Sequence, residues 1–220
     1  MNEALNQPIQ TVRSNILGTV NALDICRKYK IKRFIHASTI YANSSDGGFY
    51  RCSKKAAEDY VDEYNKIYGI NYTILRYGTI YGPRSDHTNS VNRIIKNAIL
   101  EGKITYMGNK KSMREYIHVV DAAQASVDVL KNKFKNKYVI ITGKKSIRVF
   151  QFLKVLAKIL KISKKINFKN KKNTGHYIKK PSPYIPKLGK KYLNLPYIDF
   201  EKSLFELTEN IKKDINKDLN

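Results

Sequence analysis

The chain is poor in cysteine and contains no tryptophan. Its two cysteines, Cys26 and Cys52, lie in helix-like stretches and have no paired spacing. Small secreted folds held by disulfides need more cysteines, and cysteine metal sites need them in pairs. We therefore expect no disulfide framework, no metal site, and a reduced, cytoplasmic setting.

Long apolar runs are also missing. Runs such as residues 138–141 are far shorter than the roughly 18 residues that a membrane-spanning helix needs. Residues 1–10 contain no apolar segment of the kind found in secretory signals. The sequence thus predicts neither a membrane segment nor a secretory leader.

Acidic residues are scarce in the second half of the chain. None occurs between Asp128 and Asp199, and residues 131–220 carry 24 basic against 6 acidic side chains. The excess favours either an anionic partner (a diphosphate, a nucleic acid or a membrane surface) or a lysine-rich drift in coding composition. Nucleic-acid binders rely on arginine forks and aromatic platforms, whereas residues 131–220 contain one arginine, Arg148. A nucleic-acid-binding module is therefore the least favoured reading.

Strand-like and helix-like segments alternate with short connections through about the first 140 residues. Such alternation is typical of parallel βαβ units and predicts an α/β, doubly wound sheet. Chemistry in such sheets gathers at the carboxyl ends of the strands. The expected strands are residues 33–38, 71–77, 104–107, 116–119 and 138–142; the expected helices are 15–29, 50–68 closed by Gly69, 91–101, 122–131 capped by Asp121, 147–160 and 200–211. Residues 161–198 are lysine-rich and broken by prolines.

A tyrosine and a lysine four residues apart are the first candidates for chemistry. Tyr50 and Lys54 would share one face of the helix predicted over residues 50–68. An ammonium beside a phenol favours the phenolate and lowers its pKa, which makes tyrosine a usable proton acceptor. A hydroxyl from Thr39 or Ser38, at the end of the preceding strand, could share the substrate's proton. The alternative is an ordinary solvated helix face.

Five segments, in order, carry a resemblance to a known family. They are Asn-Ile-Leu-Gly-Thr at 15–19, Lys-Arg-Phe-Ile-His-Ala-Ser-Thr at 32–39, Tyr-Arg-Cys-Ser-Lys at 50–54, Leu-Arg-Tyr-Gly-Thr-Ile-Tyr-Gly-Pro-Arg at 75–84 and Arg-Glu-Tyr-Ile-His-Val-Val-Asp at 114–121. Together they resemble the extended short-chain dehydrogenases, the NAD-dependent nucleotide-sugar epimerases and dehydratases such as UDP-glucose 4-epimerase. The resemblance covers roughly residues 8–130.

The resemblance implies a role for each matching residue. Tyr50 would be the general base, Lys54 would lower its pKa and hold the nicotinamide ribose, and Thr39 would bond the sugar hydroxyl. Ser38 is the alternative to Thr39 and a cofactor-site residue. The implied remaining contacts are Tyr77 at the nicotinamide, Arg114 at the substrate diphosphate, and Arg84 and Thr79 on the substrate side.

The resemblance also implies an architecture. Residues 1–145 would form a partial Rossmann-like catalytic domain, and residues 146–220 a small basic C-terminal substrate lobe interleaved with residues 80–115. The cofactor would be NAD, the substrate a nucleotide-diphosphate sugar, and the reaction an epimerisation or a related isomerisation or reduction by hydride transfer. A homodimer through the helix at residues 50–68 would follow as well.

The sequence departs from the family in three respects. The glycine-rich Gly-x-x-Gly-x-x-Gly turn that holds the NAD pyrophosphate is absent, which puts NAD binding in doubt. Thr39 and Tyr50 are only 11 positions apart, and Ile40 and Tyr41 stand where dehydratases have an Asp-Glu pair. Thr79 replaces an asparagine common in the family. Two further readings follow: an inactive truncated homologue, or a subunit that needs a separate NAD-binding chain.

Overall fold

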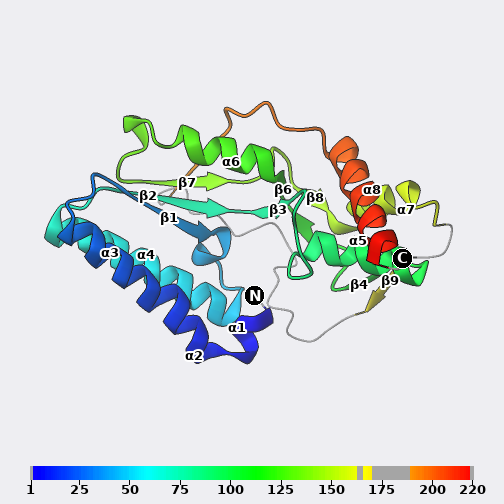
Figure 1. Ribbon diagram of the computed structural model, residues 1–220, viewed down its shortest axis with the longest axis horizontal. Helices are drawn as coiled ribbons and strands as arrows, with labels where there is room; N and C mark the ends of the chain where they lie inside the picture. The colour runs from blue at the N-terminus through cyan, green and yellow to red at the C-terminus, as the bar shows by residue number, and fades with distance from the viewer. Residues whose placement is uncertain (1, 163–165, 170–188, 219–220) are drawn as a thin grey trace.

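The computed structural model describes residues 2–162, 166–169 and 189–218, and its centre is a parallel four-stranded sheet (Figure 1). The strand order is β1 (Phe34–Thr39), β2 (Tyr72–Tyr77), β7 (Lys137–Ile141) and β10 (Lys190–Lys191). Each crossover passes through helix, as parallel pairing requires. The predicted α/β class with a parallel sheet is confirmed.

Helices cover both faces of this sheet (Figure 1). On one face lie α3 (Gly18–Lys28) and α4 (Gly48–Tyr68), where Leu23 and Val61 pack on Tyr72 and Ile74 of β2. On the other face lies α6 (Val119–Asp128), whose alanines pack against β2 and β7. Residues alternate between the two faces along each strand, so neighbouring side chains of β1 serve different layers.

The chain is helical well before the expected start at residue 15. Helices α1 (Asn2–Asn6) and α2 (Pro8–Thr11) lead into a π-helical segment, Val12–Leu17, which continues directly into α3. Asn15 lies inside this segment, where its side-chain amide donates to Ser53 Oγ of α4 at 2.9 Å. Asn15 therefore ties two helices together and does not begin one.

A second hydrophobic core lies beyond the carboxyl ends of the strands (Figure 1). It is built from three helices, α5 (Ser90–Glu101), α7 (Val149–Ile159) and α8 (Phe200–Asp218). Ile95, Leu153 and Leu204, one from each helix, are fully buried. Strand β4 (Thr105–Met107) pairs with β9 (Asn167–Lys169) beside them. Segments far apart in the sequence thus share one core.

Short strands and turns connect the sheet to this second core. They are β3 (Thr79–Tyr81) paired with β6 (Tyr116–His118), β5 (Met113–Arg114) paired with β8 (Ile147–Arg148), and 3₁₀ turns at Ile40–Asn43 and Asn132–Phe134. Gly143, just after β7, passes so close to β6 that an added Cβ would lie 2.0 Å from the Tyr116 carbonyl oxygen. Only glycine fits there.

The starts of α6 and α7 differ from the expected ones. Helix α6 begins at Val119, three residues early, because the His118 side chain accepts from the Val120 N–H and caps it. Asp121, the expected cap, is buried and accepts the Ile198 N–H at 2.9 Å. Helix α7 begins two residues late, since Ile147–Arg148 is held in strand β8.

The proline-broken stretch expected over residues 161–198 falls largely outside the described residues. In the part that the structure describes, no helix combines the length and the hydropathy needed to cross a membrane.

Candidate active site

Three candidate residues meet where β1 ends and α4 begins. Thr39 is the last residue of β1, and Tyr50 lies in the first turn of α4 with Lys54 one turn further along. Gly47 makes the entry to α4 possible: its φ is +112°, and an added Cβ would lie 2.9 Å from Arg51. The short connection between Thr39 and Tyr50 is therefore compatible with their contact.

The Tyr50 phenol forms a hydrogen bond with the Thr39 hydroxyl, which lowers the pKa of the phenol. Burial has the larger effect and raises the pKa of Tyr50, so the net shift is upward. The sequence led us to expect a lowered pKa, and the direction is opposite. The reason is that burial penalises the phenolate more than the hydrogen bond from Thr39 favours it.

Lys54 reaches back to β1. Its Nζ donates to the Ala37 carbonyl oxygen at 3.0 Å. Burial lowers the pKa of Lys54, and the nearby Glu58 carboxylate acts in the opposite direction. The Phe34 N–H donates toward β2. Backbone N–H and C=O groups of successive residues point to opposite sides of a strand, so those of Ala37 point away from β2, to the outer edge of β1. The Lys54 ammonium thus donates a hydrogen bond to a backbone carbonyl on that edge.

Ser38, the alternative to Thr39, points to the other face of the sheet. Its Oγ donates to Glu58 Oε1 at 2.6 Å, and the serine is buried. A hydroxyl engaged in this way does not face Tyr50. The structure thus places Ser38 against Glu58 and Thr39 beside Tyr50.

Tyr77 ends β2 in register with Thr39, so both lie at the same end of the sheet. Its hydroxyl shares a hydrogen bond with Ser126 Oγ of α6, at 2.6 Å. This bond fixes the ring against the α6 layer. Tyr77 thus lies at the strand ends, and its hydroxyl is hydrogen-bonded to Ser126.

A cavity of about 120 Å³ brings together two of the three candidate substrate residues. Thr79 and Arg114 both line it, and Arg114 is 6% exposed. Arg84 is exposed, has a φ of +62° and lies outside the lining residues. The lining residues are Thr79, Ser90, Val91, Arg93, Ile94, Asn97, Thr105, Tyr106, Met107, Arg114 and Tyr116.

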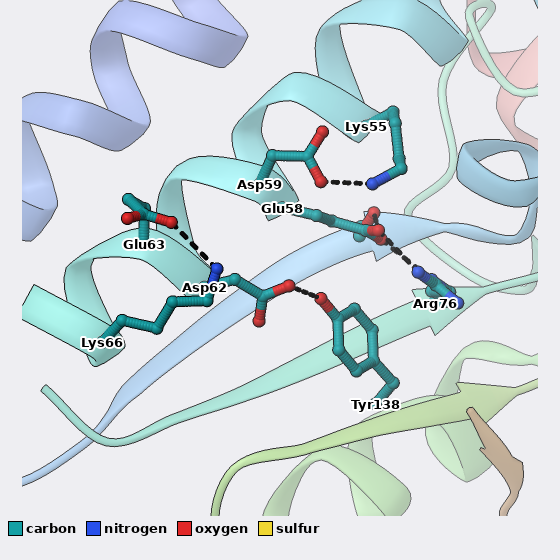
Figure 2. A network of polar contacts seen from close by, with 9 residues as sticks. Lys55, Glu58, Asp59, Asp62, Glu63, Lys66, Arg76 and Tyr138 are labelled. Atoms are coloured by element: carbon teal, nitrogen blue, oxygen red, sulfur yellow. Dashed lines mark hydrogen bonds and ion pairs between the residues drawn. The ribbon is translucent and has the colours of Figure 1, made fainter. Parts of the chain in front are cut away.

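Sequence reasoning missed a buried ionic network under the site (Figure 2). Glu58 of α4 and Arg76 of β2 form an ion pair at 2.6 Å with exposures of 0% and 2%. The Arg76 guanidinium lies 4.5 Å from the centre of the Tyr138 ring, and Tyr138 donates to Asp62 of α4. A signal was present: Glu58 follows Lys54 at helical spacing, on the same face as Tyr50 and Lys54.

The parallel sheet, with helices on both of its faces, defines a Rossmann-like α/β fold. The model described as the NAD dependent epimerase/dehydratase family matches residues 1–141, more than half of the chain. The chain belongs to this family.

Several relatives are epimerases by name. A putative UDP-glucose 4-epimerase of Methanocaldococcus jannaschii is 30% identical over 165 residues, covering 65% of this chain and 52% of the relative. A UDP-glucuronate 4-epimerase of Thermodesulfobacterium geofontis is 29% identical over 170 residues, covering 71% of this chain and 53% of the relative. The chain therefore spans about half the length of these relatives.

Solved structures share the fold. A UDP-glucose 4-epimerase of Thermotoga maritima, solved with UDP-glucose, matches with a TM-score of 0.79 at 23% identity, covering 97% of this chain and 74% of that one. A UDP-glucuronic acid 4-epimerase of Bacillus cereus, solved with NAD, matches with a TM-score of 0.73 at 24% identity, covering 90% of this chain and 67% of that one.

The residues present fit one half of the cofactor that the family name implies. The hydroxyls of Thr39 and Tyr50 and the ammonium of Lys54 lie at one strand end, and such groups suit a nicotinamide ribose. The described residues contain no glycine-rich strand-to-helix turn to hold a pyrophosphate. The fit therefore extends to the catalytic end of NAD alone.

Proposed function

We propose that this chain carries the catalytic and substrate-binding residues of a nucleotide-sugar 4-epimerase. The observation that supports this most strongly is the convergence of Thr39, Tyr50 and Lys54 at the end of β1. A hydroxyl pair beside an ammonium can take a proton from a sugar hydroxyl and return it. The UDP-sugar 4-epimerases among the relatives favour a UDP-sugar as the substrate.

Each residue has a task in the proposed reaction. NAD, when bound, would supply reversible hydride transfer to and from the sugar. Tyr50, as phenolate, takes the proton of the reacting sugar hydroxyl, and Thr39 holds that hydroxyl in place. Lys54 holds the nicotinamide ribose and contributes a positive charge. Because the net pKa shift of Tyr50 is upward, its phenolate forms at a higher pH than that of an unperturbed tyrosine.

The substrate would lie between the strand ends and the second core. Arg114, buried beside the cavity, has the forked guanidinium that suits a diphosphate. Thr79 lines the same cavity and stands two residues after Tyr77, which ends β2. Tyr77 would border the nicotinamide, and Arg84 would contribute from the exposed turn outside the cavity.

Replacing Tyr50 with phenylalanine tests the central role. We expect kcat for a UDP-sugar to fall by roughly 10²–10⁴-fold, the usual contribution of a positioned acid–base group. Tyr60→Phe, on an exposed position of the same helix, is the control and should leave kcat unchanged. Retained turnover in Tyr50→Phe, with the control intact, would show that another group moves the proton.

A second candidate is a subunit that binds the sugar nucleotide and needs another chain for NAD. The absence of a glycine-rich turn from the described residues favours it, and so does the outer edge of β1, which pairs with no described strand. Calorimetry of the folded chain with NAD, and separately with UDP-sugars, distinguishes the two. Binding of both supports the self-sufficient enzyme, whereas UDP-sugar binding without NAD binding supports the subunit.

We also propose that two copies pair through the α3–α4 layer. This layer and the helices before it expose large apolar side chains that a second copy would bury. They are Ile9, Val12, Ile25 and Ile67, each between 50% and 71% exposed.

A further inference from the structure

Three consecutive residues of β1 contact three residues spaced one turn apart on α4. The Ala37 carbonyl accepts from Lys54, the Ser38 hydroxyl donates to Glu58, and Thr39 bonds Tyr50. Positions 50, 54 and 58 share one face of the helix. The pairing sets how far α4 lies along β1, and hence where Lys54 and Tyr50 stand relative to Thr39.

Glu58 makes the strongest of these contacts. Its two carboxylate oxygens accept three hydrogen bonds: from Ser38 Oγ at 2.6 Å, from Arg76 Nε at 2.9 Å and from an Arg76 terminal nitrogen at 2.6 Å. Ser38 and Arg76 are register partners on β1 and β2, directly before Thr39 and Tyr77. One buried side chain therefore attaches α4 to both strands that end at the candidate site (Figure 2).

Glu58 also supplies the negative charge that faces Lys54. From β1, Lys54 is faced by His36, whose pKa is lowered to about 4, so this ring is neutral at pH 7. Arg76, on β2, shares the Glu58 carboxylate and is itself positive. Among the described residues, Glu58 is the acidic group that raises the pKa of Lys54.

We propose that Glu58 is a positioning residue of the candidate site, which seats α4 on β1 and β2 and provides the counter-charge for Lys54. The proposal rests on the proposed function, because it makes Glu58 responsible for the positions of Lys54 and Tyr50. Its geometry and charge can nevertheless be tested without turnover.

The first experiment compares Glu58→Gln with Asp59→Asn. Both remove one negative charge from α4, but the Asp59 side chain is 58% exposed and pairs with Lys55 at the surface. The pH dependence of amine acetylation at Lys54, followed by peptide mass spectrometry, is read in each variant. We expect the Lys54 midpoint to shift to lower pH in Glu58→Gln and to stay in place in Asp59→Asn. An unchanged midpoint in Glu58→Gln overturns the proposal.

A double variant covers the case in which Glu58→Gln does not fold. Replacing both Glu58 and Arg76 with methionine removes the pair without leaving a buried charge, an exchange that is often neutral for stability. We expect a thermal midpoint near that of the unaltered protein, together with a displaced Lys54 profile. An unaltered Lys54 profile at an unaltered thermal midpoint would overturn the proposal, because Lys54 would then need neither the Glu58 carboxylate nor its bonds to Ser38 and Arg76. Because labelling needs no activity, this result is independent of whether Tyr50→Phe supports the proposed function.

Discussion

His36 lies in a buried environment that disfavours a charged imidazole. It is 6% exposed in β1, stacks on Phe34, and its Nε2 has no hydrogen-bond partner among the described residues. Burial and the Lys54 ammonium lower the pKa of His36 to about 4. In the unfolded chain the same ring titrates near its ordinary pKa of about 6.5.

This difference predicts acid sensitivity. Between about pH 6.5 and pH 4 the unfolded chain binds a proton at His36 and the folded protein does not, so stability falls as the pH falls. We expect His36 to cost about 2 kcal/mol of unfolding free energy between pH 7 and pH 4.5. Urea unfolding of the unaltered protein and of His36→Phe at both pH values measures it. An equal loss in both proteins would contradict the prediction.

Helix α4 of the candidate site ends at Gly69, where the backbone is left-handed. Gly69 has a φ of +70°, and its N–H bonds to the Asn65 carbonyl. An added Cβ would meet no atom within 4 Å, so a substitution there carries a conformational cost without a clash. Left-handed backbone costs a non-glycine residue roughly 1–2 kcal/mol.

Gly69→Ala should therefore destabilise the protein by about 1 kcal/mol, and Gly69→Asn by less, because asparagine tolerates this conformation. Chemical denaturation of the two variants side by side gives both values. The Thr39–Tyr50 contact lies at the other end of α4 and should be unaffected. Equal losses for alanine and asparagine would indicate that the loop, and not the left-handed backbone, sets the cost.

Elements could be predicted from sequence where their causes are local. The end of α4 at Gly69 and the i, i+4 placement of Tyr50 and Lys54 follow from nearby residues, and both are present. The start of α6 was missed because Asp121 is held by Ile198, 77 positions away. The Glu58–Arg76 pair depends on how α4 packs on β2, which no short pattern encodes.

At the scale of the whole molecule, the open edge of β1 is the unusual feature. Among the described residues β1 pairs with β2 alone, and the outward groups of Ile35, Ala37 and Thr39 face no strand. Parallel strands normally have neighbours on both sides, and a free edge invites pairing with another chain. The Lys54 ammonium on the Ala37 carbonyl blunts this edge at one point only.

We expect residues 1–220, prepared alone, to associate through this edge. Ala37→Pro removes an outward N–H while leaving the bonds from β1 to β2, since proline is tolerated on an edge strand whose N–H faces away. Ala37→Ser keeps the N–H and is the matched control; Ala37 is exposed, so either side chain has room. Sedimentation velocity should show association reduced in the proline variant and retained in the serine variant. A monomer with a cooperative melting transition in the unaltered chain would refute edge pairing, because the exposed groups of β1 would then be stable in water without a partner.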